Sequence, residues 1–210
     1  MRPVLYASTN PGKIMEVRHI LTTVGLPVLA PDEIGLSLDV PEPGATLEEN
    51  ATLKARAYLQ RLPPGEFVVV ADDTGVEIDA LGGEPGIRVR RWTGEERMSD
   101  EEIIAHCLTR LRDVPPARRG AQFRTALAVG AEPEAIALFE GTLRGVILEQ
   151  PDPLRIAGFP FESLFYVAEW GMLLGAMHLL PAGKKVGLVT HRERALRRAL
   201  PHIRALCDGA

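Results

Sequence analysis

Cysteine is scarce in this sequence, since Cys107 and Cys207 are the only two among 210 residues. Two cysteines are too few for the disulfide framework that stabilises small secreted domains. Both lie in segments with a helical pattern and without metal-ligand neighbours, so we expect two reduced thiols in a cytoplasmic protein. The apolar run before Ser8 is too short for the hydrophobic region of a secretory signal, so a signal peptide is not expected.

An excess of positive charge and a long apolar run are also missing. The formal net charge is −4, which argues against a broad electrostatic surface for a nucleic acid polymer. A few lysines, backbone N–H groups and a metal ion are still enough to bind a polyphosphate. The most apolar stretch, residues 170–180, contains His178 and is shorter than the ~20 residues of a membrane-spanning helix. We therefore expect neither a nucleic acid polymer nor a membrane as a partner.

The overall composition is that of an ordinary globular protein. Hydrophobic residues make up 46% and charged residues 25% of the chain, which argues against wholesale disorder. The 20 glycines and 17 prolines predict many tight turns. A chain of this length suits one domain or a two-lobed domain.

Hydrophobic periodicity predicts an α/β protein with a mixed sheet. Strands alternate with helices in the first half, whereas the later strands are separated by short turns that favour hairpins. The run Phe67–Ala71 is apolar throughout, as in a strand buried on both faces, and Asp72–Gly75 is expected to interrupt it. The predicted strands are 4–7, 27–30, 67–71, 76–78, 122–129, 135–138 and 142–148, and the predicted helices are 13–24, 46–62, 99–111 and 191–206.

The segment Ser8–Lys13 connects a predicted strand to a predicted helix. The N–H groups and the dipole at a helix N-terminus favour an anion, and Lys13 adds a full positive charge. The segment is not a Walker A loop, because the first glycine and the hydroxyl residue after the lysine are missing. It is therefore either a phosphate-binding loop or an ordinary polar turn.

Acidic residues at the end of a buried strand form a candidate metal site. Asp72 and Asp73 are costly to desolvate unless a cation or hydrogen bonds compensate their charges. Mg²⁺ prefers hard oxygen ligands and often takes one or two carboxylates plus substrate phosphate. Glu42 lies in a loop rich in proline and glycine and offers a further oxygen, whereas Glu48 and Glu49 are typical of a helix N-terminus. The alternative is a solvated loop in which aspartate caps a turn.

Two further segments contain residues suited to a ligand. His191 and Arg192 begin the last predicted helix, where positive charge opposes the helix dipole, and this is compatible with a ligand-facing role. Phe159 and Phe161 flank a Gly-Pro turn. Their rings either belong to the core or stack on a base.

Several motifs, taken together and in order, resemble the inosine triphosphate pyrophosphatase family, hydrolases of deaminated purine nucleoside triphosphates. The resemblance covers nearly the whole chain, and its strongest part is the uninterrupted run 71–86. The motifs are Thr9-Asn10-Pro11-Gly12-Lys13 with Glu16, Thr46–Ala51 with Lys54-Ala55, Ala71-Asp72-Asp73-Thr74-Gly75 continuing to Gly86, Gly158-Phe159-Pro160-Phe161-Glu162, and Thr190-His191-Arg192.

The resemblance implies an α/β fold with an elongated mixed β-sheet and flanking helices. Residues 1–210 would form a single two-lobed domain around a nucleotide cleft, usually as a homodimer. The implied reaction is Mg²⁺-dependent hydrolysis of ITP, dITP or XTP to the monophosphate and pyrophosphate. Two alternatives stay open: the same reaction on other modified nucleotides, and a nucleotide-binding protein with weakened catalysis.

The resemblance also implies a role for each matched residue. Asp73 would be the catalytic base and would hold Mg²⁺ with Glu42 and Asp72. Arg192 would face the base and reject ATP, because arginine has only donors and a 6-oxo purine presents an acceptor there. The remaining implied substrate contacts are Thr9, Asn10 and Lys13 on the triphosphate, with Lys13 also catalytic, Thr74 on the substrate, Phe161 stacked on the purine, and Glu162, Lys185 and His191 on the base side.

The chain departs from the family pattern mainly on the base side. The loop 158–163 reads Gly-Phe-Pro-Phe-Glu-Ser where the family reads Gly-Phe-Gly-Tyr-Asp-Pro. Proline in this loop fixes φ where glycine leaves it free. The family's lysine falls on Val186, with Lys184 and Lys185 as the nearest lysines. These departures affect substrate specificity more than the type of reaction.

Overall fold

The computed structural model describes residues 1–94 and 96–209, which form two compact units. Unit 1 comprises Met1–Thr74, Thr125–Thr142 and Thr190–Ala210, and unit 2 comprises Gly75–Arg124 and Leu143–Val189. The α-helices of the described residues are α1 (Pro11–Thr22), α2 (Leu47–Leu59), α3 (Asp100–Arg110), α4 (Leu174–His178) and α5 (His191–Asp208). The strands are β1 (Val4–Tyr6), β2 (Val28–Leu29), β3 (Val68–Ile78), β4 (Pro85–Gly86), β5 (Gly120–Glu132), β6 (Ala135–Ile147), β7 (Phe165–Val167) and β8 (Met172–Leu173).

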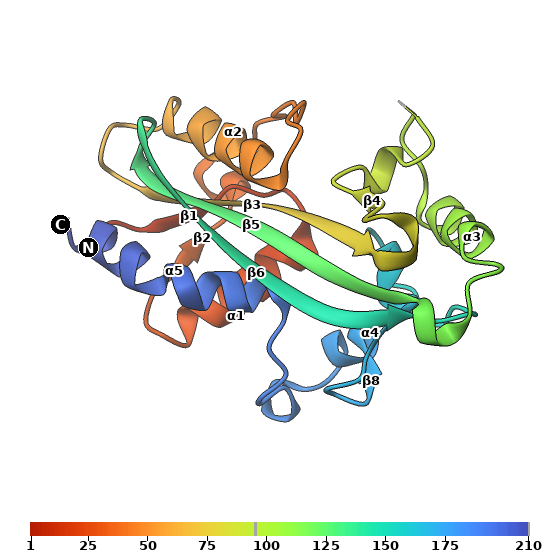
Figure 1. The fold of residues 1–210 in the computed structure, drawn as a ribbon. Coiled ribbons are helices and arrows are strands. Elements are labelled where there is room, and N and C mark those ends of the chain that lie inside the picture. Colours follow the sequence, from red (N-terminus) through yellow and green to blue (C-terminus); the bar gives the residue numbers. More distant parts are fainter. Residues whose placement is uncertain (95, 210) are drawn as a thin grey trace. The chain divides into compact units, whose positions relative to one another are not determined.

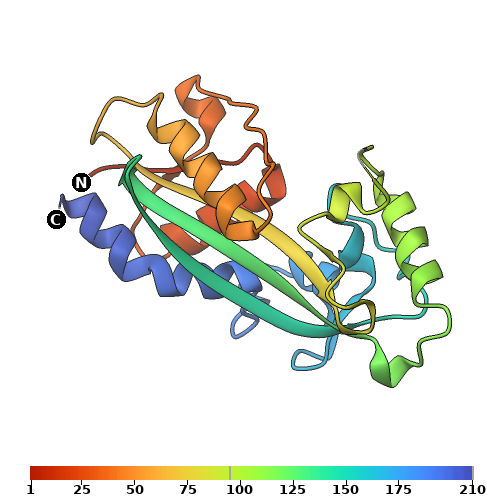
Figure 2. The ribbon, with the colours of Figure 1, turned by 45° about the horizontal axis from the view of Figure 1, so that its top comes forward.

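Unit 1 is a sheet with helices on both faces (Figures 1 and 2). Its strand order is β2-β1-β3-β5-β6, and β1 pairs in parallel with both β2 and β3. Helices α1 and α5 lie on one face and α2 lies on the other. Alternate apolar residues of β1 and β3, such as Val4 and Val70, pack against Val17 of α1 and Ala199 of α5. Burial of this face positions the start of α1 and the start of α5 beside the sheet.

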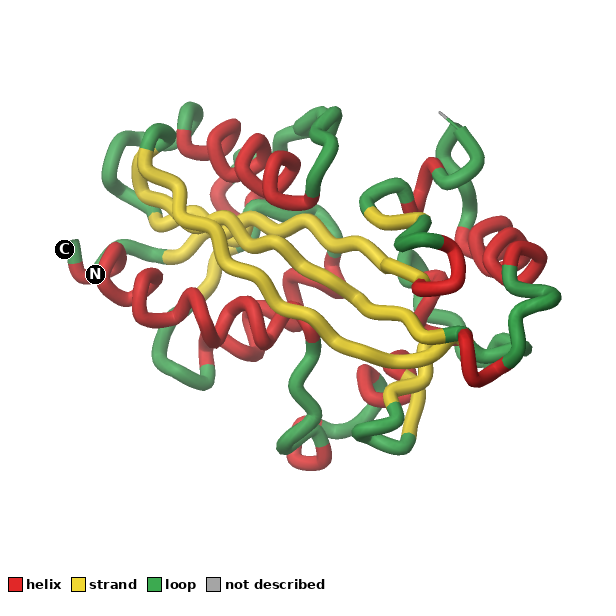
Figure 3. Tube along the Cα trace, in the orientation of Figure 1, coloured by secondary structure: helices red, strands yellow, loops and turns green. Residues whose placement is uncertain are grey.

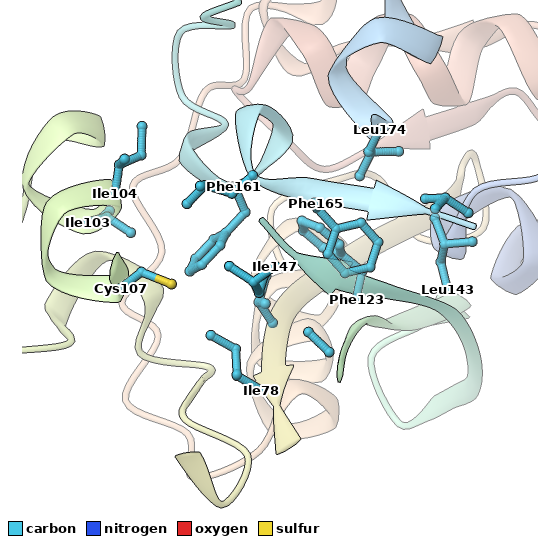
Figure 4. Packing of buried hydrophobic residues seen from close by; sticks show 14 of the residues in the cluster. Ile78, Ile103, Ile104, Cys107, Phe123, Leu143, Ile147, Phe161, Phe165 and Leu174 are labelled. Carbon is cyan, nitrogen blue, oxygen red and sulfur yellow. The ribbon is translucent and has the colours of Figure 1, made fainter. Parts of the chain in front are cut away.

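Unit 2 contains the other ends of β3, β5 and β6 together with the short strands β4, β7 and β8 (strands are yellow in Figure 3). Strand β4 pairs antiparallel with β3, β7 with β6, and β8 with β7. Its core includes Ile103 and Cys107 of α3, Ile147 of β6 and the aromatic residues Phe161 and Phe165 (Figure 4). The mixed α/β fold class expected from the sequence is confirmed.

The predicted helix starts are confirmed where a capping residue was recognised. Ser99 and Glu102 form reciprocal side chain–backbone hydrogen bonds at the start of α3, and Thr46 caps α2. Helix α1 begins earlier than expected, at Pro11 instead of Lys13. The reason is that the side chain of Asn10 accepts the first N–H groups, while Pro11 already has helical φ and lacks an N–H.

Two expected interruptions of strands are wrong. Strand β3 continues through Asp72–Gly75, and β6 continues where a break was expected between 138 and 142. Gly75 and Gly141 are sites of close approach and not turns. A Cβ at Gly75 would lie 2.5 Å from the carbonyl oxygen of Gly86, and one at Gly141 would lie 2.1 Å from that of His191.

In the part of the chain that the structure describes, no helix combines the length and apolar character needed to cross a bilayer.

Both cysteines are free and buried, and we predict that neither reacts in the native protein. Burial raises the pKa of Cys107 to about 12 and also raises that of Cys207. At pH 8, below the pKa of an ordinary thiol, a thiol of pKa about 12 carries roughly 1000-fold less thiolate than an ordinary one. Iodoacetamide labelling at pH 8 should therefore be slow in buffer and rapid in denaturant for both cysteines, whereas an exposed cysteine introduced by Ser37→Cys should react rapidly in both. Rapid labelling of native Cys107 would contradict this prediction.

Candidate active site

The loop between β1 and α1 uses its polar groups to cap the helix. The amide oxygen of Asn10 accepts hydrogen bonds from the backbone N–H groups of Gly12 (3.0 Å) and Lys13 (3.2 Å). Ser8 Oγ accepts from the N–H of Asn10, and Thr9 is exposed beside it. The cap holds the N-terminus of α1 in place, so that the Lys13 side chain reaches Asp72 in the middle of β3.

Asp72 of β3 is the centre of a buried ionic cluster. Its side chain is 1% exposed, and its Oδ1 accepts a short hydrogen bond from the hydroxyl of Tyr6. Its Oδ2 accepts from Lys13 Nζ (3.0 Å), Thr74 Oγ1 (3.0 Å) and Arg192 Nε (3.3 Å). Burial by itself would raise the pKa of Asp72, but Lys13, Arg192 and Lys54 hold it well below its usual range. Asp72 is therefore ionised, and both of its oxygens are engaged.

Arg192 begins α5 and belongs to the same cluster. Its guanidinium is 2% exposed, pairs with Glu16 of α1 and donates to Thr74 Oγ1 at 3.3 Å. Thr190, the N-cap of α5, donates to Glu16 at 2.5 Å. This hydrogen bond fixes the position of the Glu16 carboxylate that pairs with Arg192. Burial opposes the charge on Arg192, yet Glu16 and Asp72 raise its pKa above the usual value. The guanidinium expected to read the base is thus already bound to protein groups.

Asp73 points to the opposite face of the strand, because successive side chains of a strand alternate. Its Oδ2 accepts from Asn50 Nδ2 of α2 at 3.0 Å, and its Oδ1 accepts from the backbone N–H of Thr74 at 2.9 Å. Burial raises the pKa of Asp73, and Glu42 adds to this, while Lys13 and Lys54 oppose it. Two adjacent aspartates therefore have pKa values displaced in opposite directions, a pattern that separates a structural charge from a reactive one.

Lys54 and Glu42 complete the group around Asp73. Lys54 Nζ lies 2.5 Å from Glu42 Oε1 and donates to the backbone oxygen of Asp72 at 3.0 Å. Asn50 and Lys54 are four residues apart on α2 and therefore share one face of the helix. Asn50 also accepts from the N–H of Gly44 at 2.8 Å, and a Cβ at Gly44 would lie 2.5 Å from that amide oxygen. Gly44 thus lets the loop that carries Glu42 approach α2.

Of the predicted base-side residues, Phe161, Glu162 and Lys185 lie in unit 2. Phe161 is 2% exposed and packs in the core of unit 2 (Figure 4). Its ring centroid is 6.1 Å from that of Trp92. The buried carboxylate of Glu162 is 2.8 Å from Nδ1 of His178, and Lys185 donates to the backbone oxygen of His178 at 2.9 Å. The ring predicted to stack on a purine is therefore a core residue.

The structure brings together Lys13, Thr74, Arg192 and both aspartates, and it places Glu42 beside Asp73. His191 is buried at the start of α5 in the same unit. Sequence reasoning on the site did not assign Tyr6, Glu16, Asn50, Lys54 or Thr125, whose hydroxyl is 2.8 Å from that of Thr74. The family motifs already contained Glu16, Asn50 and Lys54. Helical spacing was a further signal, since Glu16 follows Lys13 by three positions and Lys54 follows Asn50 by four. Nothing local to Tyr6 or Thr125 indicated a polar role.

We predict that Asp72→Asn destabilises unit 1 by about 3–5 kcal/mol at pH 7, because it leaves buried positive charge without its partner. Urea unfolding measures the difference, and Asp39→Asn, at an exposed site, is the matched control. The difference should be complete above the unfolded pKa of 3.8 and shrink as the pH falls below it, because the folded state keeps Asp72 ionised at a lower pH than the unfolded state does. A loss no larger than that of the control would contradict the role of the cluster.

Comparison with known proteins places this chain in a family. The model of the Ham1 family matches residues 4–202. A dITP/XTP pyrophosphatase of Nocardia farcinica (strain IFM 10152) is 39% identical over 213 residues, which cover 99% of this chain and 98% of the relative. A protein of the same name from Bacillus subtilis (strain 168) is 33% identical over 198 residues, which cover 94% and 95%.

Solved structures of Ham1 proteins also match this chain. The Ham1 protein of Staphylococcus aureus has a TM-score of 0.75 at 31% identity, and the match covers 97% of this chain and 99% of that one. The HAM1 protein of Coxiella burnetii has a TM-score of 0.77 at 26% identity with the same coverage. The resemblance inferred from the sequence motifs is confirmed, and the chain belongs to the Ham1 family.

Proposed function

We propose that this protein hydrolyses deaminated purine nucleoside triphosphates, namely ITP, dITP and XTP, to the monophosphate and pyrophosphate. The observation that carries the proposal is the pair of adjacent aspartates on β3: Asp72 accepts hydrogen bonds from Lys13 and Arg192, whereas Asp73 faces α2 and accepts from Asn50. The names of the relatives, dITP/XTP pyrophosphatases, support this substrate class.

Lys13 and Lys54 supply the positive charge for the triphosphate. Both ammonium groups lie within hydrogen-bonding distance of Asp72, one at its carboxylate and one at its backbone oxygen. Thr9 and Asn10 border the same loop at the start of α1, where the helix dipole favours an anion. When a triphosphate binds here, the two ammonium groups exchange their contacts with Asp72 for contacts with phosphate oxygens.

The donor set suits a divalent metal ion held by few protein groups. Among residues 1–94 and 96–209, no three His, Cys, Asp or Glu side chains are grouped so as to hold a metal. Glu42 and Asp73 would hold the ion, and we leave Asp72 out of the ligand set because its two oxygens are already engaged. Two carboxylates with substrate phosphate are typical of Mg²⁺, which when bound neutralises phosphate charge and acidifies coordinated water.

Asp73 acts as the general base in this proposal. The hydrogen bond from Asn50 Nδ2 fixes the orientation of its carboxylate for proton transfer. Water attacks the α-phosphorus in line, its proton goes to Asp73, and the bond to the pyrophosphate oxygen breaks. Lys13 stabilises the negative charge on the phosphoryl oxygens in the transition state.

On the base side we reassign stacking from Phe161 to Phe159. Phe159 is only half-buried, and its ring centroid is 6.5 Å from that of His178, whereas Phe161 is a core residue. Glu162, Lys185 and His191 remain proposed base-side groups. We assign Arg192 to the ionic cluster around Asp72, so rejection of ATP no longer depends on it. Because the loop 158–163 differs from the family pattern, other modified nucleotides are the second candidate substrates.

We also propose a single two-lobed catalytic domain, acting as a homodimer in the cytoplasm. Strands β3, β5 and β6 each contribute residues to both units, so a boundary between the units would cut through three strands. The dimer rests on the family resemblance, and the cytoplasmic location rests on the reduced, buried thiols.

We predict that Asp73→Asn lowers kcat for ITP and XTP by about 10²–10⁴-fold, the usual contribution of a general base. Product analysis of the wild-type reaction with Mg²⁺ should give pyrophosphate and not orthophosphate, and Asp39→Asn should leave the rate unchanged. Orthophosphate as the first product would contradict attack at the α-phosphorus. Tight ITP binding without turnover in Mg²⁺ or Mn²⁺ would instead indicate a binding protein.

The two phenylalanines give a matched test of base binding. Phe159→Ala should raise KM for ITP about tenfold with little loss of stability, because stacking on a base is worth about 1–3 kcal/mol. Phe161→Ala should lower the free energy of unfolding by about 3–5 kcal/mol, because it opens a cavity in the core. Steady-state kinetics and urea unfolding measure both effects. A Phe161→Ala protein of normal stability with a raised KM would restore the original assignment.

A further inference from the structure

The ammonium group of Lys54 lies at the pair of carboxylates proposed to hold the metal. Its Nζ is 2.5 Å from Glu42 Oε1 and 3.0 Å from the backbone oxygen of Asp72, and its side chain is only 15% exposed. It is also close enough to Asp73 for the two charges to affect each other's pKa. The ammonium group thus already lies beside the carboxylates that would bind the proposed divalent ion.

The charges around this point are nearly balanced without a metal. Four carboxylates, those of Glu16, Glu42, Asp72 and Asp73, are opposed by three cations, Lys13, Lys54 and Arg192. Arg192 and Asp72 are buried inside the cluster and are held by several partners. Glu42 is 34% exposed, so the Lys54–Glu42 pair is the contact that solvent and ligands reach most easily.

Resting on the proposed metal site, we propose that Lys54 substitutes for the divalent ion in the nucleotide-free protein and couples metal binding to triphosphate binding. A metal that binds alone must separate Glu42 from the ammonium and then lie beside an unpaired positive charge, which weakens its binding. A triphosphate gives Lys54 new partners, so metal and nucleotide each strengthen the binding of the other by the same factor.

A structural ion pair makes a different prediction from this coupling. If Lys54 only tied the loop of Glu42 to α2, its removal would lower stability and leave metal affinity unchanged or weaker. If Lys54 competes with the metal, its removal makes the nucleotide-free protein bind metal more tightly. Metal affinity without nucleotide therefore separates the two roles, and it does not depend on turnover.

The experiment is a Mn²⁺ titration of the nucleotide-free protein followed by electron paramagnetic resonance. Lys54→Gln retains an N–H donor for the backbone oxygen of Asp72, and Lys54→Met, which lacks it, is the second variant. Both should bind Mn²⁺ at least about tenfold more tightly than wild type, because one neighbouring positive charge is removed. Lys184→Met, at an exposed lysine of unit 2, is the control and should bind like wild type.

Adding Asp73→Asn to Lys54→Gln should abolish the gain in affinity, which places the bound Mn²⁺ at the proposed site. Equal Mn²⁺ affinity in wild type and both Lys54 variants would overturn the coupling, and with ITP turnover intact it would leave the proposed function standing. A gain that survives Asp73→Asn would overturn the coupling and the metal assignment together. Absence of ITP and XTP turnover in the wild type would refute the proposed function separately.

Discussion

The buried charge of Asp72 is the constraint on which the rest of unit 1 depends. A carboxylate without water requires partners, and here they come from β1, α1, β3 and α5, through Tyr6, Lys13, Thr74 and Arg192. Each partner lies far along the chain from at least one other. Satisfying one charge therefore fixes how the beginning, the middle and the end of the sequence meet beside the middle of β3.

The neighbouring residue, Asp73, lies in a different environment. Strand alternation directs Asp73 to the other face, where α2 supplies Asn50 and Lys54 in place of Lys13 and Arg192. Burial that is only partly compensated raises the pKa of Asp73. Two adjacent residues of β3 therefore differ. Asp72 is a buried, ionised carboxylate that holds the surrounding cations in place, and Asp73 is a carboxylate of raised pKa beside the loop of Glu42.

Local signals in the sequence predicted local structure well. The capping residues Thr46 and Ser99 marked helix starts that the structure contains, and the apolar run 67–71 marked the central strand. Gly75 and Gly141 were misleading because glycine serves turns and close backbone contacts alike. The neighbour that requires glycine at each position comes from a distant part of the chain, so no local pattern distinguishes the two cases.

The sequence by itself determined the chemical types present: carboxylates after a buried strand, a lysine after a capped loop, and motifs sufficient to recognise the family. The tertiary structure alone decided which of these groups is accessible. It engaged both oxygens of Asp72, paired Arg192 with Glu16, and placed Phe161 in a core. Burial and charge compensation depend on neighbours contributed by distant segments, and these neighbours are set by packing and not by the local order of residues.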